Sequence, residues 1–251
     1  PAAICERGPV CREVGDVADV ARALARAARK RGVVRVTAMP YFAGDEAAQA
    51  ERGLIAAGFR ITQTWDGAHA RTLRVPLGDA DPFAGKDGKS LRQRVRQAEK
   101  AGVVTRVVRG AEVGKLEALY ATLMREQGKS LKPHVYFEAI DRTLLGSGRG
   151  AVVVSELEGR PVSAAFVARH GGLTTWVIGA TSPERTTAYS KMVPTVMAAI
   201  AWAREAGCHT FDLGGIPLAD DPDEKRKSIA QFKHYFAKEP VVLAREHARV
   251  L

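Results

Sequence analysis

The sequence predicts an α/β fold of two lobes, each with a mixed central sheet flanked by helices. In the second lobe, Glu158-Gly159 and Gly171-Gly172 separate three runs of alternating apolar and polar residues, which is typical of an antiparallel meander; the runs span residues 151–157, 161–168 and 173–178. A long apolar helix over about residues 187–206 and a strand ending at Asp212 follow. In the first lobe, helix and strand patterns alternate over residues 1–78.

The first lobe is predicted to begin with a helix that Asp16 caps and Gly32 ends. Its buried stripe consists of Val17, Val20, Ala21, Leu24 and Ala28. The elements that follow are a strand over residues 33–38, a helix over 45–58 and strands over 59–65 and 70–77. Because the chain starts at Pro1 rather than Met and its first residues already look like the middle of a domain, we expect that an N-terminal portion of this lobe is missing.

Residues 79–88 are rich in turn-forming residues and mark the boundary to a second lobe over residues 79–239. Before the meander, the predicted elements of this lobe are a helix over residues 89–100, a strand over 103–108 and helices over 112–127 and 134–145. After Asp212 come an acidic loop over residues 217–226 and a helix over 227–236. The second lobe therefore ends on a strand, a loop and a helix.

The chain of 251 residues carries a formal net charge of +10. A basic excess favours a polyanionic partner, such as RNA, a nucleotide-linked substrate or an anionic membrane surface. A high Arg and Ala content also arises from genomic bias, so the distribution of the charge matters more than its total. The longest apolar run, residues 192–203, is too short to span a bilayer and is better explained as a buried helix.

The cysteines and histidines predict neither a disulfide nor a metal site. Cys5, Cys11 and Cys208 form an odd set without Cys-x-x-Cys spacing, so we expect reduced thiols in a cytoplasmic protein. The six histidines form no His-x-x-x-His or His-Glu-x-x-His pair, so zinc is not expected.

The helix over residues 89–100 carries cations on one side. Arg92, Arg96 and Lys100 are four residues apart and share a face, and Arg94 lies beside them. Such a run is in general a solvated helix face. Here the cations are offset by Glu99 alone, and their mutual repulsion is costly unless an anion approaches. We interpret this face as a binding surface for phosphates, either of tRNA or of an acceptor's pyrophosphate.

The stretch over residues 207–236 carries the most specific pattern. A short strand ends in Asp212-Leu213-Gly214-Gly215, and after the acidic loop a helix carries Phe232, Lys233 and Phe236. This pattern resembles the C-terminal signature of the Fem family, the aminoacyl-tRNA-dependent peptidyltransferases that add bridge amino acids to peptidoglycan precursors. The alternative is an ordinary strand, loop and amphipathic helix.

The resemblance covers nearly the whole chain. It includes the basic helix, which Gly102-Val103-Val104-Thr105 follows as at the start of the family's second lobe. It implies two lobes of acetyltransferase-like (GNAT-like) fold, and the order meander, helix, strand, helix is that of this fold. It also implies that residues 240–251 return as a strand to the first lobe.

Lys233 is the candidate catalytic residue. Transfer from an aminoacyl ester needs orientation of two substrates and stabilisation of a developing oxyanion, and a cation next to the ester carbonyl suffices. Phe232 would shape the wall of this site. Asp212 is a second candidate for substrate contact, although an Asp beside glycines more often caps a turn.

The resemblance places further substrate contacts in the second lobe. Lys132 and Tyr136 stand where the family places a basic residue and a tyrosine on the muramyl-peptide acceptor, and the alternative is a core tyrosine with a surface lysine. Lys132 replaces the more common Arg, which weakens bidentate phosphate binding but keeps the charge.

Arg185, Tyr189 and Lys191 are candidates for contact with an anionic substrate, or else ordinary polar residues of a loop.

The segment between the meander and the next helix argues against coenzyme A as the donor. Acetyl-CoA enzymes of this fold carry a glycine-rich loop there, because backbone amides must approach the pyrophosphate closely. Residues 182–191 contain no glycine. We therefore expect no cofactor, with aminoacyl-tRNA as the donor substrate.

The resulting prediction is an aminoacyltransferase that moves an amino acid from aminoacyl-tRNA to an amine of a UDP-linked or lipid-linked muramyl peptide. We expect a cytoplasmic monomer or weak dimer, with peripheral contact to an anionic membrane left open. One alternative is an N-acyltransferase or tRNA-dependent peptide ligase of the same fold that acts on another amine. A second is a non-catalytic, basic RNA- or anion-binding module. The transferred amino acid and the acylated position do not follow from the sequence.

Overall fold

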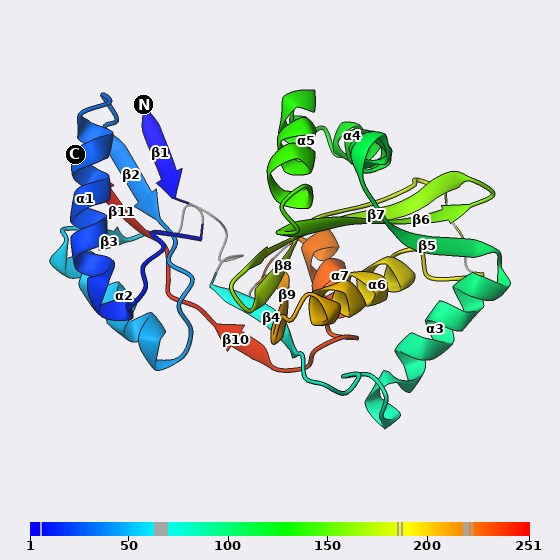
Figure 1. The fold of residues 1–251 in the computed structure, drawn as a ribbon. Helices are drawn as coiled ribbons and strands as arrows, with labels where there is room; N and C mark the ends of the chain where they lie inside the picture. The colour runs from blue at the N-terminus through cyan, green and yellow to red at the C-terminus, as the bar shows by residue number, and fades with distance from the viewer. Residues whose placement is uncertain (6, 63–69, 185, 187, 218–220, 222) are drawn as a thin grey trace. The chain divides into compact units, whose positions relative to one another are not determined.

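The computed structural model describes the chain of 251 residues except residues 6, 63–69, 185, 187, 218–220 and 222. The chain forms two compact units (Figure 1). The first unit combines Pro1–Arg74 with Gly215–Leu251, and the second unit is the continuous segment Val75–Gly214. The first unit is therefore built from two segments that are distant in sequence.

A four-stranded sheet with the order β1-β2-β11-β3 lies in the first unit. Its strands are β1 (Ala2–Cys5), β2 (Arg35–Ala38), β3 (Arg60–Ile61) and β11 (His247–Val250). β1 is parallel to β2, whereas β11 is antiparallel to both β2 and β3. The strand from the C-terminal segment thus lies between two strands from the N-terminal segment.

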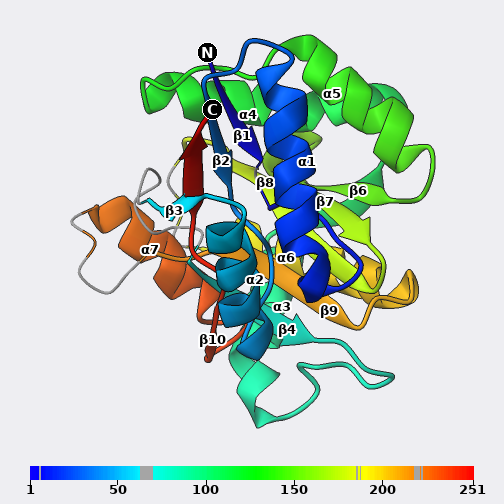
Figure 2. The same ribbon diagram turned by 90° about the vertical axis from the view of Figure 1, so that its left-hand side faces the viewer.

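Helices α1 (Val17–Arg29) and α2 (Asp45–Ala56) pack against this sheet, as Figure 2 shows from the side of the first unit. Their shared core consists of Leu54 and many small side chains, among them Ala21, Ala25, Ala28, Ala47 and Ala50. A Cβ added at Gly53 would lie only 3.2 Å from the Cβ of Val17. The glycine in α2 therefore permits the close approach of the two helices.

A seven-stranded sheet has the order β10-β4-β9-β8-β7-β6-β5. Its strands are β4 (Arg71–Pro76), β5 (Val103–Val108), β6 (Gly150–Leu157), β7 (Arg160–His170), β8 (Leu173–Thr181), β9 (Thr210–Gly215) and β10 (Pro240–Val242). Strands β5 to β8 are antiparallel neighbours, and β9 runs parallel to β8. The predicted meander over residues 151–178 is thus confirmed, with each of its three strands slightly longer than expected.

Helices cover both faces of the meander in the second unit (Figure 1). On one face, α4 (Gly114–Glu126) and α5 (His134–Ile140) bury Leu116, Phe137 and Ile140 against Val152, Val154 and Phe166 of the sheet. On the other face lies α6 (Met192–Glu205), which in turn packs against α3 (Lys89–Lys100). The α/β architecture with a mixed sheet between helices agrees with the prediction.

Three buried hydroxyl groups connect α6 to the sheet. The Oγ1 atom of Thr195 in α6 is hydrogen-bonded to Ser155 Oγ at 2.7 Å and to Ser163 Oγ at 2.6 Å. Ser155 also bonds Thr105 Oγ1 at 2.8 Å, and Ser163 donates to the backbone oxygen of Lys191 at 2.7 Å. Ser155, Ser163 and Thr195 are fully buried. This chain of hydroxyls sets the position of α6 and of the segment before it.

Four charged side chains form a network where β5 and β6 meet α4. Arg106 pairs with Glu112 and with Glu156, and Lys115 contacts the same two carboxylates at 2.9 and 2.8 Å. Hydrogen bonds from Arg106 and then from Lys115 lower the pKa of Glu112 to about 2. The network thus holds the carboxylate of Glu112 in its charged form.

This network predicts a specific loss of stability in acid. Because the pKa of Glu112 in the folded chain lies below its ordinary value of 4.5, its contribution is present above pH 4.5 and is lost as the pH falls towards about 2. In Glu112→Gln we expect the urea midpoint of unfolding to fall less steeply across this window than in the wild type. Glu126→Gln, an exposed change at the end of α4, is the control and should follow the wild-type curve. Parallel curves for Glu112→Gln and wild type would contradict the prediction.

Several element boundaries differ from the prediction. α6 begins at Met192 rather than at residue 187, which places Pro194 in the first turn, where its missing N–H has no helical acceptor. α7 spans Glu224–Lys233 rather than residues 227–236, because the side chain of Asp223 accepts from the N–H groups of Lys225 and Arg226. The predicted helix over residues 134–145 is α-helical only as far as Ile140, and Asp141–Leu145 form a π-helical turn.

The C-terminal segment also differs in detail. The predicted strand over residues 240–251 is two strands, β10 and β11, and β11 returns to the sheet of the first unit. The compact units group residues 215–239 with the first unit, whereas we predicted them in the lobe over residues 79–239. The backbone bond from Ile216 to Arg71 at 3.0 Å contributes to this grouping. In the described part of the chain, no helix combines the length and apolarity needed to cross a membrane.

Candidate active site

Asp212 makes a local hydrogen bond near the end of β9. Its side chain is fully buried, and its Oδ1 accepts a hydrogen bond from the backbone N–H of Gly214 at 2.7 Å. Gly214 has a φ of 80°, a conformation that favours glycine. This contact is local, as expected for an Asp beside glycines, and the substrate contact predicted for Asp212 stays a prediction.

The side chain of Lys233 is bonded to the backbone of Gly215, the last residue of β9. Lys233 is the last residue of α7, it is 9% exposed, and its Nζ donates to the backbone oxygen of Gly215 at 2.8 Å. The segment after Gly215 is fixed in turn by Arg71, whose Nη2 donates to the backbone oxygen of Pro217 at 3.0 Å. The ammonium of Lys233 therefore has a defined position on the protein and does not extend into bulk water.

Phe232 belongs to an aromatic cluster at the same helix end. Its ring centroid lies 5.4 Å from that of the buried Phe236 and 6.4 Å from that of Tyr235, in tilted and edge-to-face arrangements. Such geometry is favourable for aromatic pairs and limits the motion of the rings. The ring of Phe232 is thus fixed at the end of α7, and its role as the wall of a site around Lys233 stays a prediction.

Lys132 and Tyr136 contact each other at the start of α5. The Nζ of Lys132 lies 4.4 Å from the centroid of the Tyr136 ring, a cation–π contact. Tyr136 also packs edge-on against the buried Phe137 at 5.4 Å, whereas Lys132 is exposed. The pair therefore presents a positive charge on an aromatic surface that is anchored in the core of the second unit.

Tyr189 and Lys191 line a hollow of about 250 Å³ between the β6–β7 hairpin and the segment before α6. The Nζ of Lys191 donates to the backbone oxygen and the Oγ of Ser182, both at 2.9 Å, and to the backbone oxygen of Glu184. Burial lowers the pKa of Lys191. Its hydrogen bonds thus go to its own segment, and Arg185, the third predicted residue here, lies outside the described residues.

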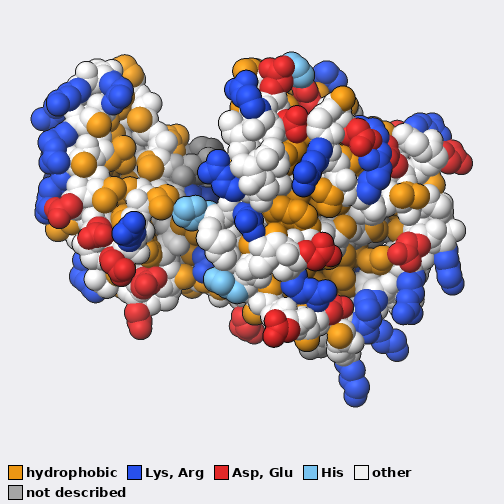
Figure 3. Space-filling model, viewed as in Figure 1, with side chains coloured by type: hydrophobic (Ala, Val, Ile, Leu, Met, Phe, Trp, Pro, Cys, Tyr) orange, Lys and Arg blue, Asp and Glu red, His pale blue; other side chains and the backbone are white. Residues whose placement is uncertain are grey.

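The cations of α3 lie on the surface of the second unit, where Figure 3 shows Lys and Arg side chains gathered. Leu91 and Ala98 are buried, whereas Arg96 and Lys100 are exposed. Arg92 donates to the backbone oxygen of Gly85 at 3.1 Å, and Arg94 is half-buried. The helix therefore has the amphipathic arrangement that the spacing predicted, with Arg96 and Lys100 exposed.

Sequence reasoning did not identify Arg71, which holds the segment after Gly215. No local motif marks it, because its contact with Pro217 joins residues 146 positions apart. Among the described residues, no three His, Cys, Asp or Glu side chains come close enough together to hold a metal ion.

Comparison with known proteins adds to this geometry. The model of an acetyltransferase (GNAT) domain matches residues 86–233. A crystal structure of FemX superposes with a TM-score of 0.74 over 98% of this chain and 79% of its own, at 16% identity. L-PGS from Bacillus licheniformis gives a TM-score of 0.61 over 94% of this chain and 73% of its own, at 16% identity. A tandem GNAT protein from the clavulanic acid biosynthesis pathway gives 0.57 over 96% and 72%, at 14% identity.

A search of curated protein sequences found no match. At these identities, the likeness to the solved structures establishes the fold, and it confirms the predicted α/β acetyltransferase-like architecture.

Proposed function

The chain belongs to the acetyltransferase (GNAT) domain family, and from this premise we propose that it transfers an amino acid from aminoacyl-tRNA to an amine of a peptidoglycan precursor peptide. The family supports acyl transfer in general. The likeness in fold to FemX over 98% of the chain supports the aminoacyl donor, as does the Asp212-Leu213-Gly214-Gly215 and Phe232-Lys233 pattern.

The observation that carries the proposal is the position of Lys233. The side chain of Lys233 is nearly buried, and its ammonium lies 2.8 Å from the Gly215 oxygen. The preceding residue, Phe232, packs on Phe236. A fixed cation of this kind, placed next to an ester carbonyl, stabilises the negative oxygen that forms during acyl transfer. An aminoacyl ester is already activated, so the remaining contribution is the orientation of the two substrates.

In the proposed reaction, the acceptor amine attacks the carbonyl carbon of the aminoacyl ester. A C–N bond forms, and the carbonyl oxygen becomes an oxyanion that Lys233 stabilises. The tetrahedral intermediate then collapses, the ester C–O bond breaks, and the ribose oxygen of the tRNA leaves and takes up the proton that the amine loses. This proton transfer requires no base from the protein, since the substrate or its phosphates can accept the proton from the amine and pass it to the ribose oxygen.

The segment before α6 supports tRNA rather than coenzyme A as the donor. A loop that binds the pyrophosphate of coenzyme A offers backbone N–H groups to it. Here the oxygens of Ser182 and Glu184 converge on the ammonium of Lys191, and the N–H of Ala188 donates to Thr186 Oγ1 at 3.2 Å. We therefore propose that no coenzyme takes part, and that the cations of α3 and Lys132 with Tyr136 contact the phosphates and the acceptor.

We place the reaction in the cytoplasm, where charged tRNA and UDP-linked precursors are found, and expect a monomer or weak dimer. The test is an assay of the purified protein with a panel of charged tRNAs and a UDP-linked muramyl pentapeptide. We expect transfer of radiolabelled amino acid that ribonuclease abolishes and that acyl-CoA neither supports nor stimulates. Dependence on acyl-CoA with indifference to ribonuclease would favour an N-acyltransferase, and tRNA binding without turnover would favour a non-catalytic module.

A further inference from the structure

A second group of cations surrounds a hollow of about 430 Å³ in the first unit. Four come from α1 and the turn after it, and the fifth comes from β11; the charged residues that line the hollow are Arg22, Arg26, Arg29, Lys30 and Arg249. Ala25 and Leu251 complete the lining. The lining side chains thus include five cations and no carboxylate. Arg22, Arg26, Arg29 and Lys30 are three or four residues apart or adjacent in sequence, a helical spacing from which this basic face could have been predicted.

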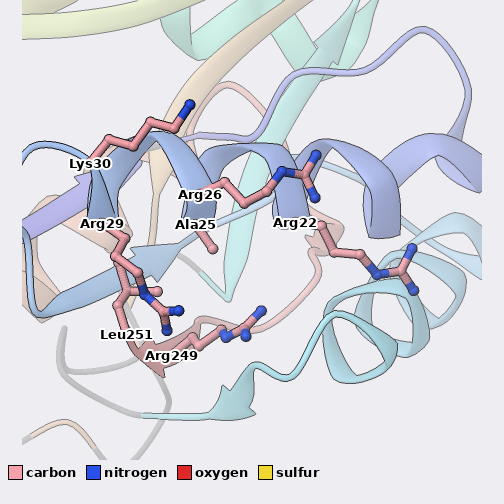
Figure 4. A pocket seen from close by; sticks show the side chains of 7 residues that line it. All are labelled: Arg22, Ala25, Arg26, Arg29, Lys30, Arg249 and Leu251. Atoms are coloured by element: carbon pink, nitrogen blue, oxygen red, sulfur yellow. The ribbon is translucent and has the colours of Figure 1, made fainter.

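Two separate elements bring cations to this hollow. Figure 4 shows Arg29 on α1 and Arg249 on β11, whose side chains both lie at the hollow, with Leu251 beside them. Arg249 is fixed by its Nη1, which donates to the backbone oxygen of Ala57 at 2.6 Å. Like charges gathered around one hollow repel one another, whereas an anion placed in the hollow would be attracted by all of them.

Structural roles account for only part of the group. Arg22 pairs with Asp19 at 2.6 Å and reaches the backbone oxygen of Ala56. Arg26, Arg29 and Lys30 are exposed, and within the described residues their side chains make no hydrogen bond or ion pair. Cations in the last turn of a helix do complement its dipole. The helix dipole does not explain why Arg249, from a separate strand, lines the same hollow as the cations of α1.

We infer that this surface, formed by α1 and β11, binds the sugar–phosphate backbone of tRNA. The inference rests on the proposed aminoacyl-tRNA donor and adds a contact on the first unit to those expected on α3. Arginine presents a planar fork of donors that matches phosphate oxygens, and four of the five cations are arginines.

The surface fits RNA better than a membrane. A helix that inserts into an anionic bilayer needs large apolar side chains beside its cations. The exposed residues of α1 are Asp19, Ala23, Arg26 and Arg29, which include no large apolar side chain. The exposed Val250 follows Arg249 in β11, so the alternation of a strand directs it to the opposite face of the sheet.

The test measures binding of deacylated tRNA to the full chain as a function of salt. In Arg26→Glu/Arg29→Glu we expect an affinity about tenfold lower and a log–log salt slope less steep by about 1.4 to 1.8, since each of the two phosphate contacts contributes about 0.7 to 0.9. Arg12→Glu/Arg52→Glu is the matched control: it changes the net charge equally on exposed arginines of the same unit that do not line the hollow. It should keep the wild-type slope. Arg26→Gln/Arg29→Gln removes the same two contacts without adding negative charge, so it should lose less affinity but show a similar change in slope.

Equal losses in the two charge-reversal variants, or an unchanged slope in Arg26→Glu/Arg29→Glu, would overturn the inference. So would a variant that binds tRNA normally but loses binding to phosphatidylglycerol vesicles, because the partner would then be a membrane. The proposed function fails separately. A wild-type chain that binds tRNA through this surface but transfers no amino acid would refute the transfer and leave the docking surface in place.

Discussion

Replacing Lys233 with methionine is expected to abolish amino-acid transfer, with a loss of at least about 10²-fold in kcat. Methionine fills a similar volume without the charge, so the oxyanion of the transition state loses its stabilising partner. The ammonium also donates to the Gly215 oxygen at 2.8 Å, and we expect the loss of that bond to cost about 1 to 2 kcal/mol of stability. The measurements are transfer of radiolabelled amino acid from charged tRNA, tRNA affinity and the midpoint of thermal unfolding.

Lys227→Met is the control for this change. Lys227 lies on the same helix and pairs with Glu224 at 2.9 Å on the surface, so its replacement should leave transfer nearly unchanged. Lys233→Arg keeps the charge but changes its position, and we expect partial activity. Undiminished transfer in Lys233→Met would remove the proposed mechanism. A loss of transfer accompanied by an equal loss of folded protein would show that the lysine only supports the fold.

Replacing Thr195 with valine should give the largest loss of stability among the changes considered. Valine has the shape of threonine but lacks the hydroxyl that bonds Ser155 and Ser163 at 2.7 and 2.6 Å. Both serines are fully buried, so each loses a partner that water cannot replace. We expect the free energy of unfolding to fall by about 2 kcal/mol. For a chain of this size, that corresponds to a melting midpoint lower by about 4 to 8 °C.

Two variants test whether the hydroxyl network causes this effect. Thr195→Ser keeps the hydroxyl and should recover most of the stability. Thr122→Val removes a hydroxyl that donates to the Ala118 oxygen within α4, and it should change the free energy of unfolding by less than about 0.5 kcal/mol. Equal effects of Thr195→Val and Thr122→Val would show that the network does not contribute as described.

The elements that the sequence predicted well are those with local signals. The strands of the meander follow from alternation and from Glu158-Gly159 and Gly171-Gly172, which lie within the hairpins themselves. β1 was missed because it has four residues and a partner, β2, that begins thirty-three positions later. The start of α6 was placed too early, since no side-chain cap marks where this helix begins.

The candidate site shows the same limit. The pattern around Phe232 and Lys233 identified the residues, and the spacing of Arg92, Arg96 and Lys100 identified a basic face. The burial of Lys233 could not be predicted, because it depends on where the chain places Gly215 and on Arg71, which bonds Pro217. The hydrogen bonds of Lys191 to its own segment were likewise hidden, since any lysine in a polar loop gives the same sequence signal.

The position of β11 between β2 and β3 has a consequence for the order in which the strands of this sheet are synthesised. Residues 75–214 emerge as one continuous stretch and can close on themselves while the tail is still being made. Until β11 emerges from the ribosome, one edge of β2 has no neighbour, and an open edge of this kind is a template for pairing with another chain. Nascent chains halted before residue 247 should therefore self-associate through their N-terminal part.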